Sequence, residues 1–563
     1  MLAAPRNSRG ARAPAPDVTW RRPALLDTTF APFRNRTYFA FWSAVLVSNF
    51  GGLIQMVGAG WLMTSLTDSP SMVALVQASN TLPMMVFMLF AGAAADMFDR
   101  RKVMLTAQIF MFTISALLLG FAAAGLLSPW TLLLFTFLIG SGNALNNPSW
   151  QASMGDIFPR EELPAAVAMN AMGFNMTRSV APAIGGVIVA AFGAVAAFAV
   201  NTFSYLFIIT FLFRWKREVE PRALDREQLT RAISAGIRYA LMSPNIYRVG
   251  LRGFLFGVTA VAMLALLPLV VRFKLGQTAD VYGLMLGAFG VGAVAGALTS
   301  VSLREALRNE YIVRGTFALN GLALVTMGLA DTVWMTGLCL MVSGACWVQT
   351  MSLLNVSVQL ASPRWVVGRT LGMHQMGAFG GMALGSWLWG TVAEGASLDT
   401  ALVCAGVLML SAIAVGFLLP LPDFNTEDLA PLDRFREPEL ALGISGRSGP
   451  VRVQVTYRIA EADRITFLTL MAQRRRIRMR DGAQRWALLR DLQAPECWTE
   501  SYQVPTWTEY LRHNQRRTRS DGPVADEIRA LHRGDAPPEV HRWIERQPDP
   551  NMPDPPVRLH PEI

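Results

Sequence analysis

The chain has 563 residues, of which 52% are hydrophobic and 16% are charged, whereas roughly 25% of residues are charged in an ordinary soluble protein. This composition excludes an average soluble enzyme and a disordered chain. The charges are unevenly spread, because residues 423–563 hold 22 basic and 22 acidic residues out of 50 and 40 in the whole chain. The first 422 residues are therefore poor in charge and carry the entire net charge of +10. We expect a membrane domain followed by a neutral soluble domain.

Twelve stretches are apolar and long enough to cross a bilayer, because a hydrocarbon core about 30 Å thick needs roughly 20 helical residues. They run approximately Tyr38–Met63, Met72–Ala95, Val103–Ala124, Pro129–Asn147, Leu163–Ala191, Ala196–Phe213, Gly253–Val271, Tyr282–Leu303, Tyr311–Leu329, Trp334–Leu360, Leu371–Ala393 and Thr400–Leu419. The N-terminal arm, 1–37, has no apolar core before Tyr38 and does not look like a cleavable signal peptide. We expect the first span to act as the insertion signal.

The distribution of Lys and Arg predicts the orientation of these spans. With the N-terminus inside the cell, the cytoplasmic segments hold 25 Lys and Arg residues, and the outside connections hold only Arg272 and Lys274. Loops rich in Lys and Arg stay on the cytoplasmic side of a membrane. We therefore expect a multi-pass protein of a bacterial inner membrane, with both termini in the cytoplasm.

The membrane part contains a weak internal repeat. Three matches share an offset of 204 residues, namely Gly92-Ala93 with Gly296-Ala297, residues 169–173 with 373–377, and Gly186 with Gly390. We expect twelve transmembrane helices in two six-helix pseudo-repeats, 38–213 and 253–422, joined by a basic cytoplasmic linker, 214–252. Duplicated halves are a common plan for transporters, in which the substrate lies near the middle of the membrane between the halves.

A first motif lies between the second and third spans, where residues 92–102 read Gly-Ala-Ala-Ala-Asp-Met-Phe-Asp-Arg-Arg-Lys. This segment resembles the loop signature of the major facilitator superfamily, Gly-x-x-x-Asp-(Arg/Lys)-x-Gly-Arg-(Arg/Lys)-(Arg/Lys). The resemblance implies an inside gate formed by Gly92, Asp96, Asp99, Arg100 and Arg101. In such a gate Gly92 permits close helix approach, and Asp96 caps a helix or pairs with an arginine. The alternative is that the basic residues only set the topology.

A second motif lies in the fifth span, where residues 177–186 read Thr-Arg-Ser-Val-Ala-Pro-Ala-Ile-Gly-Gly. It resembles the Gly-x-x-x-Gly-Pro-x-x-Gly-Gly element of drug:proton antiporters, although Thr177 and Ala181 replace two glycines. Pro182 bends the helix, and Gly185 and Gly186 permit tight packing where the halves meet. Alone, the motif describes a kinked packing helix, but within a duplicated bundle it favours export.

The region from Asn147 to Asn175 is similar to the transmembrane secretion effector branch of the superfamily, which includes exporters of enterobactin-type siderophores. The resemblance extends over essentially the whole membrane part. It implies a secondary active transporter that exports a small amphiphilic molecule, such as a siderophore or a drug, by proton antiport with alternating access. The alternatives are an uptake permease of the same fold and a membrane-tethered, monooxygenase-like enzyme. No Gly-x-x-x-x-Gly-Lys-(Ser/Thr) loop is present, so we do not expect ATP to drive transport.

Polar residues inside the spans are the candidate substrate contacts. Arg178 lies near the middle of the fifth span, where a cation costs at least about 2.5 to 3.5 kcal/mol unless a cavity or a partner compensates it. No predicted span has a carboxylate near its middle, so an acidic substrate would provide the counter-ion. The alternative is an arginine satisfied by carbonyl groups and by amides, such as Asn143 or Asn175. Further candidate substrate contacts are Gln55, Asn80 and Asn355, although amides also join helices.

His374 is the candidate proton carrier, because histidine titrates near neutral pH. The alternative is a hydrogen-bonded packing residue. The four cysteines lack the spacing of a metal site, and we expect no metal, no cofactor and no enzymatic activity. The expected partners of the membrane part are the lipid bilayer, a small-molecule substrate and protons.

The soluble part follows a polar linker, 423–450. Residues 451–459 alternate strictly between apolar and polar, as in a half-buried strand. Further strands are expected at 485–491 and 498–504, and helices at 462–476, 506–517 and 524–532, whereas the chain from Pro537 onward is expected to be loose. This order predicts a ferredoxin-like α+β cytoplasmic domain, 451–546, followed by a Pro-rich tail, 547–563.

The soluble part resembles antibiotic-biosynthesis-monooxygenase-like domains. The resemblance rests on Trp-Thr-Glu-Tyr-Leu-Arg at 507–512 and on Arg-Arg-Thr at 516–518, with Tyr510 where a histidine is expected. It implies a docking or self-associating regulatory domain rather than an active oxygenase. Five arginines between 474 and 480 suggest contact with anionic lipids. We expect no nucleic acid partner, because the soluble part has no net charge.

Overall fold

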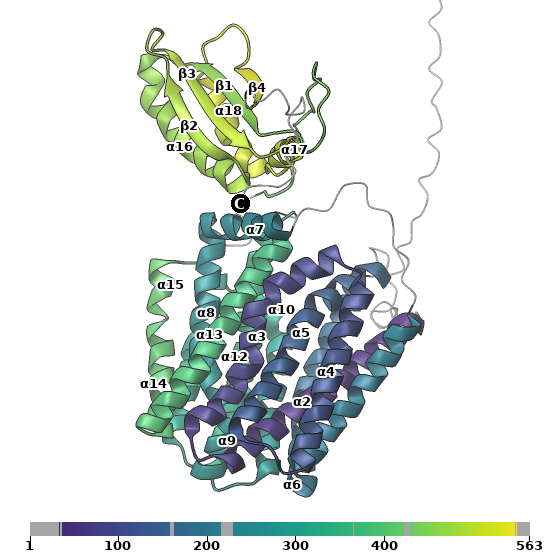
Figure 1. Cartoon of the computed structure of the whole chain (residues 1–563). Coiled ribbons are helices and arrows are strands. Elements are labelled where there is room, and N and C mark those ends of the chain that lie inside the picture. Colours follow the sequence, from purple (N-terminus) through teal and green to yellow (C-terminus); the bar gives the residue numbers. More distant parts are fainter. Residues whose placement is uncertain are drawn as a thin grey trace, which may run out of the picture.

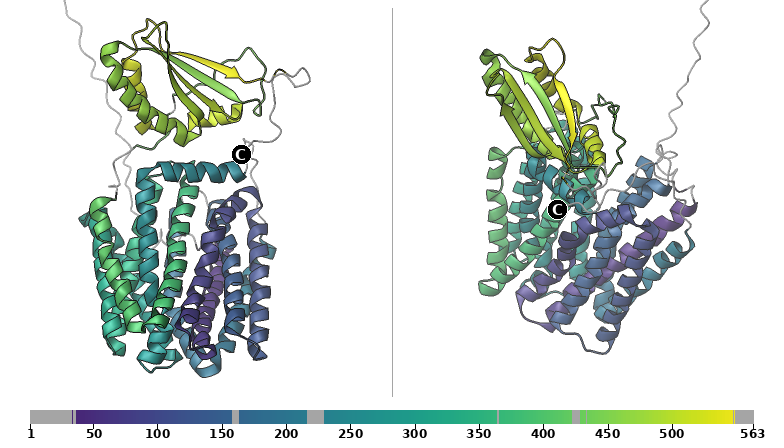
Figure 2. Two further views of the ribbon diagram at one scale, coloured as in Figure 1. Left: turned by 60° about the vertical axis from the view of Figure 1, so that its left-hand side comes forward. Right: turned by 45° about the horizontal axis from the view of Figure 1, so that its top comes forward.

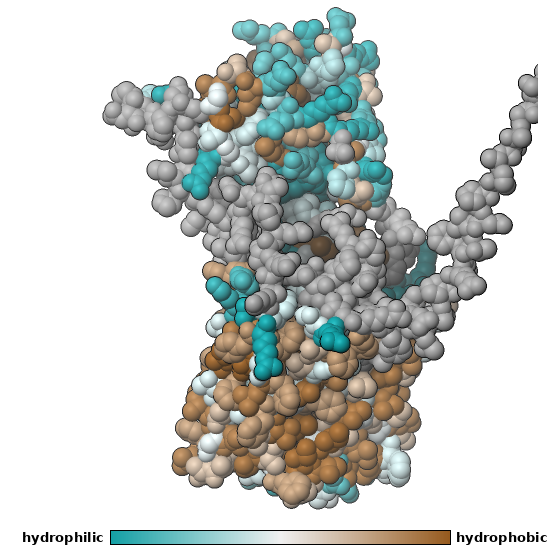
Figure 3. Space-filling view, turned by 90° about the vertical axis from the view of Figure 1, so that its right-hand side faces the viewer, coloured by the Kyte–Doolittle hydropathy of each residue, from teal (hydrophilic) through white to brown (hydrophobic). Residues whose placement is uncertain are grey.

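The computed structural model describes residues 33, 36–157, 163–215, 229–363, 365–421, 428–432, 434–546 and 548. Within these ranges, nine helices are long and apolar enough to cross a membrane. Hydrophobic residues cover the visible face of the helical bundle, whereas the visible face of the C-terminal domain is mainly hydrophilic (Figure 3). This contrast agrees with a membrane-embedded part and a part in water.

The first set of helices packs mainly against itself. It consists of α2 (Arg36–Leu66), α3 (Pro70–Met97), α4 (Arg100–Ala123), α5 (Pro129–Ile157) and α6 (Leu163–Arg214). The principal contacts are those of α6 with α2 and α4, and those of α5 with α3 and α4. Helix α6 contains both the fifth and the sixth predicted spans, which meet at Gly193. The positive φ of +77° at this residue is a conformation that glycine adopts without strain, so the chain turns back there.

The second set also packs mainly against itself. It consists of α8 (Pro244–Ala265), α9 (Leu267–Leu269), the π-helical segment η2 (Val270–Lys274), α10 (Ala279–Ala306), α11 (Asn309–Leu329), α12 (Val333–Leu360), α13 (Val367–Gly395), α14 (Leu398–Ser411) and α15 (Ala414–Leu418). An additional helix, α7 (Leu229–Met242), lies across the end of the bundle that faces the C-terminal domain (Figure 1). Helices α5 and α13 are long enough to span a membrane but are less apolar than the nine spanning helices.

The two sets meet mainly through two helix pairs, α6 with α10 and α3 with α13. In each pair the backbones of the two helices are in direct contact. A Cβ atom added to Gly186 on α6 would lie 2.6 Å from the Cα atom of Gly283 on α10, and a Cβ atom added to Gly390 on α13 would lie 2.9 Å from the Cα atom of Ser71 on α3. Helices approach this closely only where small residues face each other.

These contacts involve Gly186 near the turn of α6 at Gly193, Gly283 near the start of α10, Ser71 near the start of α3 and Gly390 near the end of α13. Those helix ends lie on the side of the bundle remote from the C-terminal domain (Figure 1). Arg272 donates hydrogen bonds to the Thr64 hydroxyl at 2.8 Å and the Ser65 hydroxyl at 2.6 Å there, so the second set is bonded to the first. Toward the C-terminal domain, a Cβ atom added to Gly92 on α3 or to Gly372 on α13 would meet nothing within 4 Å. Among the described residues, close glycine contacts between α3 and α13 are therefore found at Gly380 and Gly390 but not at Gly92 or Gly372.

The C-terminal domain contains an antiparallel four-stranded sheet in the order β2-β3-β1-β4. Its elements are β1 (Val451–Arg458), α16 (Arg464–Asp481), β2 (Gln484–Arg490), β3 (Cys497–Val504), α17 (Trp507–Gln515), α18 (Gly522–Ala530) and β4 (Glu539–Ile544), with short 3-10 turns before α16 and α18. Alternate residues of β1 are buried, as the sequence pattern predicts. Val453, Tyr457, Phe467 and Tyr502 belong to the core between the sheet and its helices.

The expectation that the chain is loose from Pro537 onward is wrong for residues 537–546, whereas the Pro-rich tail, 547–563, lies outside the described residues except for 548. Strand β4 pairs antiparallel with β1, from Glu539 opposite Thr456 to Ile544 opposite Val451. The two prolines at 537 and 538 precede the strand, so they remove no hydrogen bond from the ladder. The part of the predicted linker that the structure describes also packs on the domain, where the ring of Phe435 lies 5.9 Å from that of Tyr510.

The C-terminal domain lies over α7 and the second set of helices (Figure 2). The guanidinium group of Arg516 lies 4.3 Å from the ring centroid of Trp365, in the connection between α12 and α13. The guanidinium group of Arg480 lies 5.3 Å from the ring centroid of Tyr239 on α7. The side chain of Arg238 donates a hydrogen bond to the carbonyl oxygen of Arg480 at 3.4 Å. Cationic side chains and aromatic rings therefore form much of the junction.

Candidate functional site

Arg178 connects the two sets of helices. It belongs to α6, and its guanidinium carbon lies 5.1 Å from the ring centroid of Phe289 on α10 and 5.6 Å from that of Trp347 on α12. No carboxylate among the described residues pairs with it. Each of these two cation–π contacts contributes about 0.5 to 2 kcal/mol, which offsets part or all of a cost of at least about 2.5 to 3.5 kcal/mol for a cation in a membrane. An anionic group beside Arg178 would add the counter-charge that the rings do not provide.

The packing of α6 against α10 places Arg178 at this position. Gly290 on α10 lies directly against the backbone of Arg178 and Ser179, where it leaves no room for a side chain. Of the glycines on α10, Gly283, Gly287 and Gly290 face α6, whereas Gly292 and Gly296 face α12. Arg178 therefore lies beside the last of these glycine contacts between α6 and α10.

The Pro-x-x-Gly-Gly motif faces two different helices. A Cβ atom added to Gly185 would lie 3.2 Å from the Cα atom of Ile54 on α2, whereas Gly186 faces α10. The carbonyl oxygen of Pro182 would lie 2.7 Å from a Cβ atom added to Gly283. The motif thus packs α6 against α2 of its own set of helices, hereafter the first half, and against α10 of the second set, hereafter the second half.

One of the candidate amides, Gln55, is bonded inside the first half. Gln55 is only 5% exposed, and its side-chain oxygen accepts hydrogen bonds from Ser115, at 3.1 Å, and from Asn201. It therefore joins α2, α4 and α6 inside the first half, which is the alternative role for an amide. Asn80, Asn143 and Asn355 are half-buried. The side chain of Asn175 lies outside the described residues.

The loop motif contributes helix caps. Asp99 is the N-cap of α4, where its carboxylate accepts a hydrogen bond from the Arg101 N–H at 2.9 Å. Arg101 in turn donates to the carbonyl oxygens of Leu212, at 2.7 Å, and Phe213, at 2.9 Å, at the end of α6. These bonds join elements of one half. The close approach expected at Gly92 is not observed, Arg100 is half-buried, and the side chain of Asp96 lies outside the described residues.

His374 is buried, with 3% of its surface exposed, between α13 and α8. Its ring fills the space beside Gly253, where an added Cβ atom would lie 2.6 Å from its Cε1 atom. Its Nδ1 atom is buried and has no hydrogen-bond partner among the described residues. The structure therefore places the histidine within the second half and leaves one of its nitrogens unpaired.

Sequence reasoning missed a buried ion cluster at the domain-facing end of the second half. Arg252 is 1% exposed and donates to the Glu310 carboxylate at 3.0 Å, and Arg314 donates to the same carboxylate at 2.8 Å. The other oxygen of Glu310 accepts from the backbone N–H of Leu421 at 2.8 Å. The spacing of Glu310 and Arg314 by four residues at the start of a span was the available signal.

Sequence comparison relates the chain to known transporters. The family model described as a transmembrane secretion effector matches residues 27–549. Enterobactin exporter EntS of Citrobacter koseri is 27% identical over 417 residues, which cover 72% of this chain and 95% of that protein. Multidrug efflux pump Tap of Mycolicibacterium fortuitum is 25% identical over 401 residues, which cover 67% of this chain and 94% of that protein.

Solved structures of transporters share the fold. A bacterial homologue of the human lysosomal transporter Spinster, in an inward-facing and unoccupied conformation, has a TM-score of 0.56 at 13% identity and covers 69% of this chain and 97% of its own. PepTSo, a POT family transporter, has a TM-score of 0.54 at 14% identity and covers 68% and 97%. The relatives are transporters and not enzymes. The chain belongs to the transmembrane secretion effector family of the major facilitator superfamily.

Proposed function

We propose that this protein is a secondary active exporter that carries a small amphiphilic molecule, such as a siderophore or a drug, across a bacterial inner membrane in exchange for protons. The observation that carries this proposal is the position of Arg178. Its charge lies between α6 of the first half and the rings of Phe289 and Trp347 in the second half, without a carboxylate partner among the described residues. A substrate with an acidic group would provide the missing counter-charge. The named exporters among the relatives support the outward direction.

Alternating access is the proposed mechanism. With twelve spans and both termini in the cytoplasm, the closed end of the bundle faces the outside, and Arg178 is reached from the cytoplasm. Export then requires the hydrogen bonds of Arg272 and that between Ser69 and Glu394, which measures 3.1 Å, to break as the halves rock. An arrangement that is closed at the outer end and open at the cytoplasmic end would load a substrate from the cytoplasm.

His374 is the proposed proton carrier. Its helix, α13, is one of the two helices of the second half that pack closely on the first half. A positive charge on the buried ring would therefore appear on a helix that must move during the transport cycle. The unpaired Nδ1 atom provides a position for the proton.

The C-terminal domain is proposed to be ferredoxin-like and regulatory. The order strand, helix, strand, strand, two helices, strand and a sheet with β1 and β3 in the centre support this fold. Its contacts with α7 and Trp365 support a docking role on the second half. Self-association through the same domain remains part of this proposal.

Transport into inside-out membrane vesicles tests the function. Vesicles energised with a proton gradient should accumulate enterobactin or a hydrophobic dye, and a protonophore should abolish the accumulation. Arg178→Gln should abolish accumulation of an acidic substrate without loss of protein from the membrane, whereas Arg178→Lys should retain part of it. Accumulation only in right-side-out vesicles would indicate uptake instead. Normal export by Arg178→Gln would remove Arg178 from the substrate site.

A further inference from the structure

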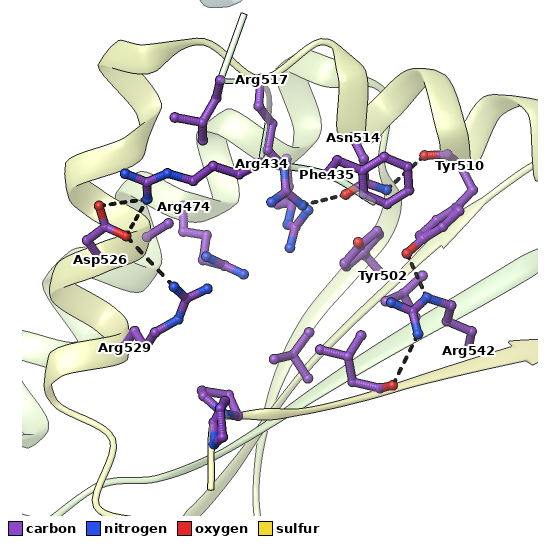
Figure 4. A pocket seen from close by; sticks show the side chains of 18 of the residues that line it. Arg434, Phe435, Arg474, Tyr502, Tyr510, Asn514, Arg517, Asp526, Arg529 and Arg542 are labelled. Atoms are coloured by element: carbon purple, nitrogen blue, oxygen red, sulfur yellow. Dashed lines mark hydrogen bonds and ion pairs between the residues drawn. The ribbon is translucent and has the colours of Figure 1, made fainter. Parts of the chain in front are cut away.

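The C-terminal domain contains a pocket of about 310 Å³ that is separate from Arg178. It lies between the inner face of the sheet and the helices, with side chains of α16, α17, α18 and β4 around it (Figure 4). A volume of this size lies at the lower end of the range for sites that hold small organic ligands.

The charges around this pocket are strongly unbalanced. Among the described residues that line it are seven arginines and one carboxylate, that of Asp526. A second carboxylate, Glu500, is completely buried beneath the pocket. Residues 423–563 as a whole carry no net charge, with 22 basic and 22 acidic residues, so arginines are strongly over-represented around this pocket. A cavity lined by one sign of charge attracts ligands of the opposite sign.

The two carboxylates are already engaged. Glu500 accepts hydrogen bonds from Arg474, at 2.8 Å, and Arg478, at 3.2 Å. Burial alone would raise the pKa of Glu500, but these two arginines lower it below its ordinary value, so the group is ionised at neutral pH. Asp526 accepts both of its hydrogen bonds from Arg434, at 2.8 and 2.9 Å. Neither carboxylate remains for the other arginines.

Among the described residues, two arginines of the pocket have hydrogen bonds to neutral partners alone. Arg517 donates to the side-chain oxygen of Asn514 at 2.7 Å, and Arg542 donates to the hydroxyl oxygen of Tyr510 at 2.7 Å (Figure 4). Burial and the nearby charge of Arg478 lower the pKa of Arg517 to about 10. These cations therefore lie in a confined, positively charged environment, which an anion would stabilise.

Arg542 lies at a position where a packed sheet usually has an apolar side chain. Its strand pairs with β1, and Arg542 lies opposite Val453, between the pairs Val540–Val455 and Ile544–Val451. Alternate residues of a strand face the same side, so Arg542 shares the inner face with these valines. A charged residue in such a place departs from the local pattern, as happens most often at functional positions.

The remaining wall of the pocket is apolar and aromatic. Val453 and Val455 provide part of the floor, and the rings of Phe435, Tyr502 and Tyr510 lie around it. A ligand that satisfies both parts of the wall has a flat apolar body and acidic groups that reach the arginines. Guanidinium groups bind carboxylates with two parallel hydrogen bonds, so carboxylates fit this set of donors.

We propose that this pocket binds a small aromatic dicarboxylic acid from the cytoplasm, as a second ligand site distinct from the transport path. Arg517 and Arg542 hold the carboxylates, and Tyr502, Tyr510 and the valines of β1 hold the ring.

The pocket adjoins the junction with the membrane part. Arg517 lines the pocket, and its chain neighbour Arg516 contacts Trp365 in the α12–α13 connection. On α16, Arg478 lines the pocket, and Arg480, half a turn later, contacts Tyr239 on α7. The same two segments therefore line the pocket and hold the domain on the second half.

Calorimetric titration of the full-length protein in lipid nanodiscs tests the site. The probes are phthalate, which has an aromatic ring and two carboxylates, benzamide, which has the ring without charge, and inorganic phosphate, which has charge without a ring. Phthalate should bind once per chain, more weakly as salt is added, whereas benzamide and phosphate should bind at least about tenfold more weakly. Equal affinity for benzamide, or no binding of phthalate, would overturn the proposal.

Variants locate the bound probe. Arg517→Gln and Arg542→Gln should each weaken phthalate binding by about tenfold, which corresponds to the loss of one charge-assisted contact. Arg517→Lys should retain most of the affinity, because it keeps the charge. Arg476→Gln is the matched control, since Arg476 is an exposed arginine of α16 outside the pocket. Hydrogen exchange of β1 verifies that each variant is folded, and unchanged binding by folded Arg517→Gln and Arg542→Gln proteins would exclude this pocket.

Discussion

Gly186 and Gly390, which lie 204 residues apart in the sequence, make equivalent contacts in the structure. Gly186 packs against the backbone of Gly283 in the second half, and Gly390 packs against the backbone of Ser71 in the first half. Both contacts involve the ends of α3, α10 and α13 that are remote from the C-terminal domain and the turn of α6. The sequence repeat therefore corresponds to a repeated contact between the two halves, in which Gly186 and Gly390 occupy equivalent positions.

A methyl group at either glycine should disturb this closure. The Cβ atom of Gly186→Ala would lie 2.6 Å from backbone carbon, and that of Gly390→Ala would lie 2.9 Å from it, so the helices must separate. We expect both variants to insert into the membrane and to lose transport by about tenfold or more, because a shift of about 1.4 kcal/mol between the open and closed states changes their ratio tenfold. Vesicle transport assays measure this loss.

Gly120→Ala is the control for these two variants. Gly120 lies in α4 with nothing within 4 Å of an added Cβ atom. Alanine there should leave transport unchanged, apart from a small gain in helix stability. Equal transport by all three variants would show that the glycine contacts are not needed for the transport cycle.

The sequence predicts the helices well and their partners poorly. A run of apolar residues determines each span locally, so Arg178 could be placed in the middle of one. The rings that surround it come from Phe289 and Trp347, more than 100 residues further along the chain, and only the packing of the halves brings them together. Gln55 was also assigned wrong neighbours by sequence reasoning. Its amide suggested a residue that lines a polar cavity, but it is hydrogen-bonded to Ser115 and Asn201 inside the first half.

The ion cluster of the second half should stabilise the protein. Glu310→Gln would leave Arg252, which is 1% exposed, without its counter-charge. Removal of one partner from a buried ion pair costs about 3 to 5 kcal/mol. We expect the thermal unfolding midpoint of the purified protein, followed by fluorescence-detected size exclusion, to fall by several degrees.

Glu305→Gln provides the matched control, since Glu305 is exposed near the end of α10 and has no ion-pair partner among the described residues. Its unfolding midpoint should equal that of the unmodified protein. If Glu310→Gln also unfolds at that temperature, the cluster contributes nothing to stability.

The aromatic residues at the domain junction should control docking. Trp365→Ala removes the ring that Arg516 contacts, and Tyr239→Ala removes the ring that Arg480 contacts. Each cation–π contact contributes about 0.5 to 2 kcal/mol. The double variant should therefore broaden the distance distribution between spin labels at Leu241 on α7 and Arg476 on α16, measured after the four native cysteines are replaced.

Trp334→Ala is the control for the docking variants, because Trp334 is 90% exposed at the start of α12, remote from the domain. Its distance distribution should match that of the unmodified protein. An unchanged distribution in the double variant would show that other contacts hold the domain in place.

The C-terminal domain shows a second limit of sequence reasoning. Strand β4 was not predicted, because Arg542 interrupts the alternation of Val540 and Ile544 that would have indicated it. The basic run on α16 suggested a lipid contact, yet Arg478 is buried in an ion pair with Glu500. The two residues that depart from the expected patterns, Arg542 and Arg478, both line the arginine-rich pocket.

Two buried groups of this domain should give opposite dependences of stability on pH. Burial and the charges of Arg478 and Arg517 lower the pKa of His513 well below its ordinary value, so only the unfolded chain binds a proton as pH falls below about 6.5. Stability is then lost on acidification, by up to about 1.4 kcal/mol per pH unit.

Burial raises the pKa of Asp481 to about 6, although its ion pair with Arg480 opposes the shift. The folded state binds that proton first, so acidification from pH 6 to about 4 adds stability.

Substitution of either His513 or Asp481 should therefore leave the pH dependence of stability that the other residue causes. Between pH 7 and pH 5 the two effects partly cancel, and the carboxylate of Glu500, whose pKa is lowered, contributes only below about pH 4.3. His513→Gln, which keeps an acceptor for the hydrogen bond with Arg478, should make the domain more stable at pH 5 than at pH 7. Asp481→Asn should make it less stable at pH 5. Hydrogen exchange of β1 and β3 in the full-length protein, corrected for intrinsic rates, measures both slopes. His541→Gln, at an exposed histidine, should keep the original slope, and the same slope in all three variants would mean that neither buried group titrates as described.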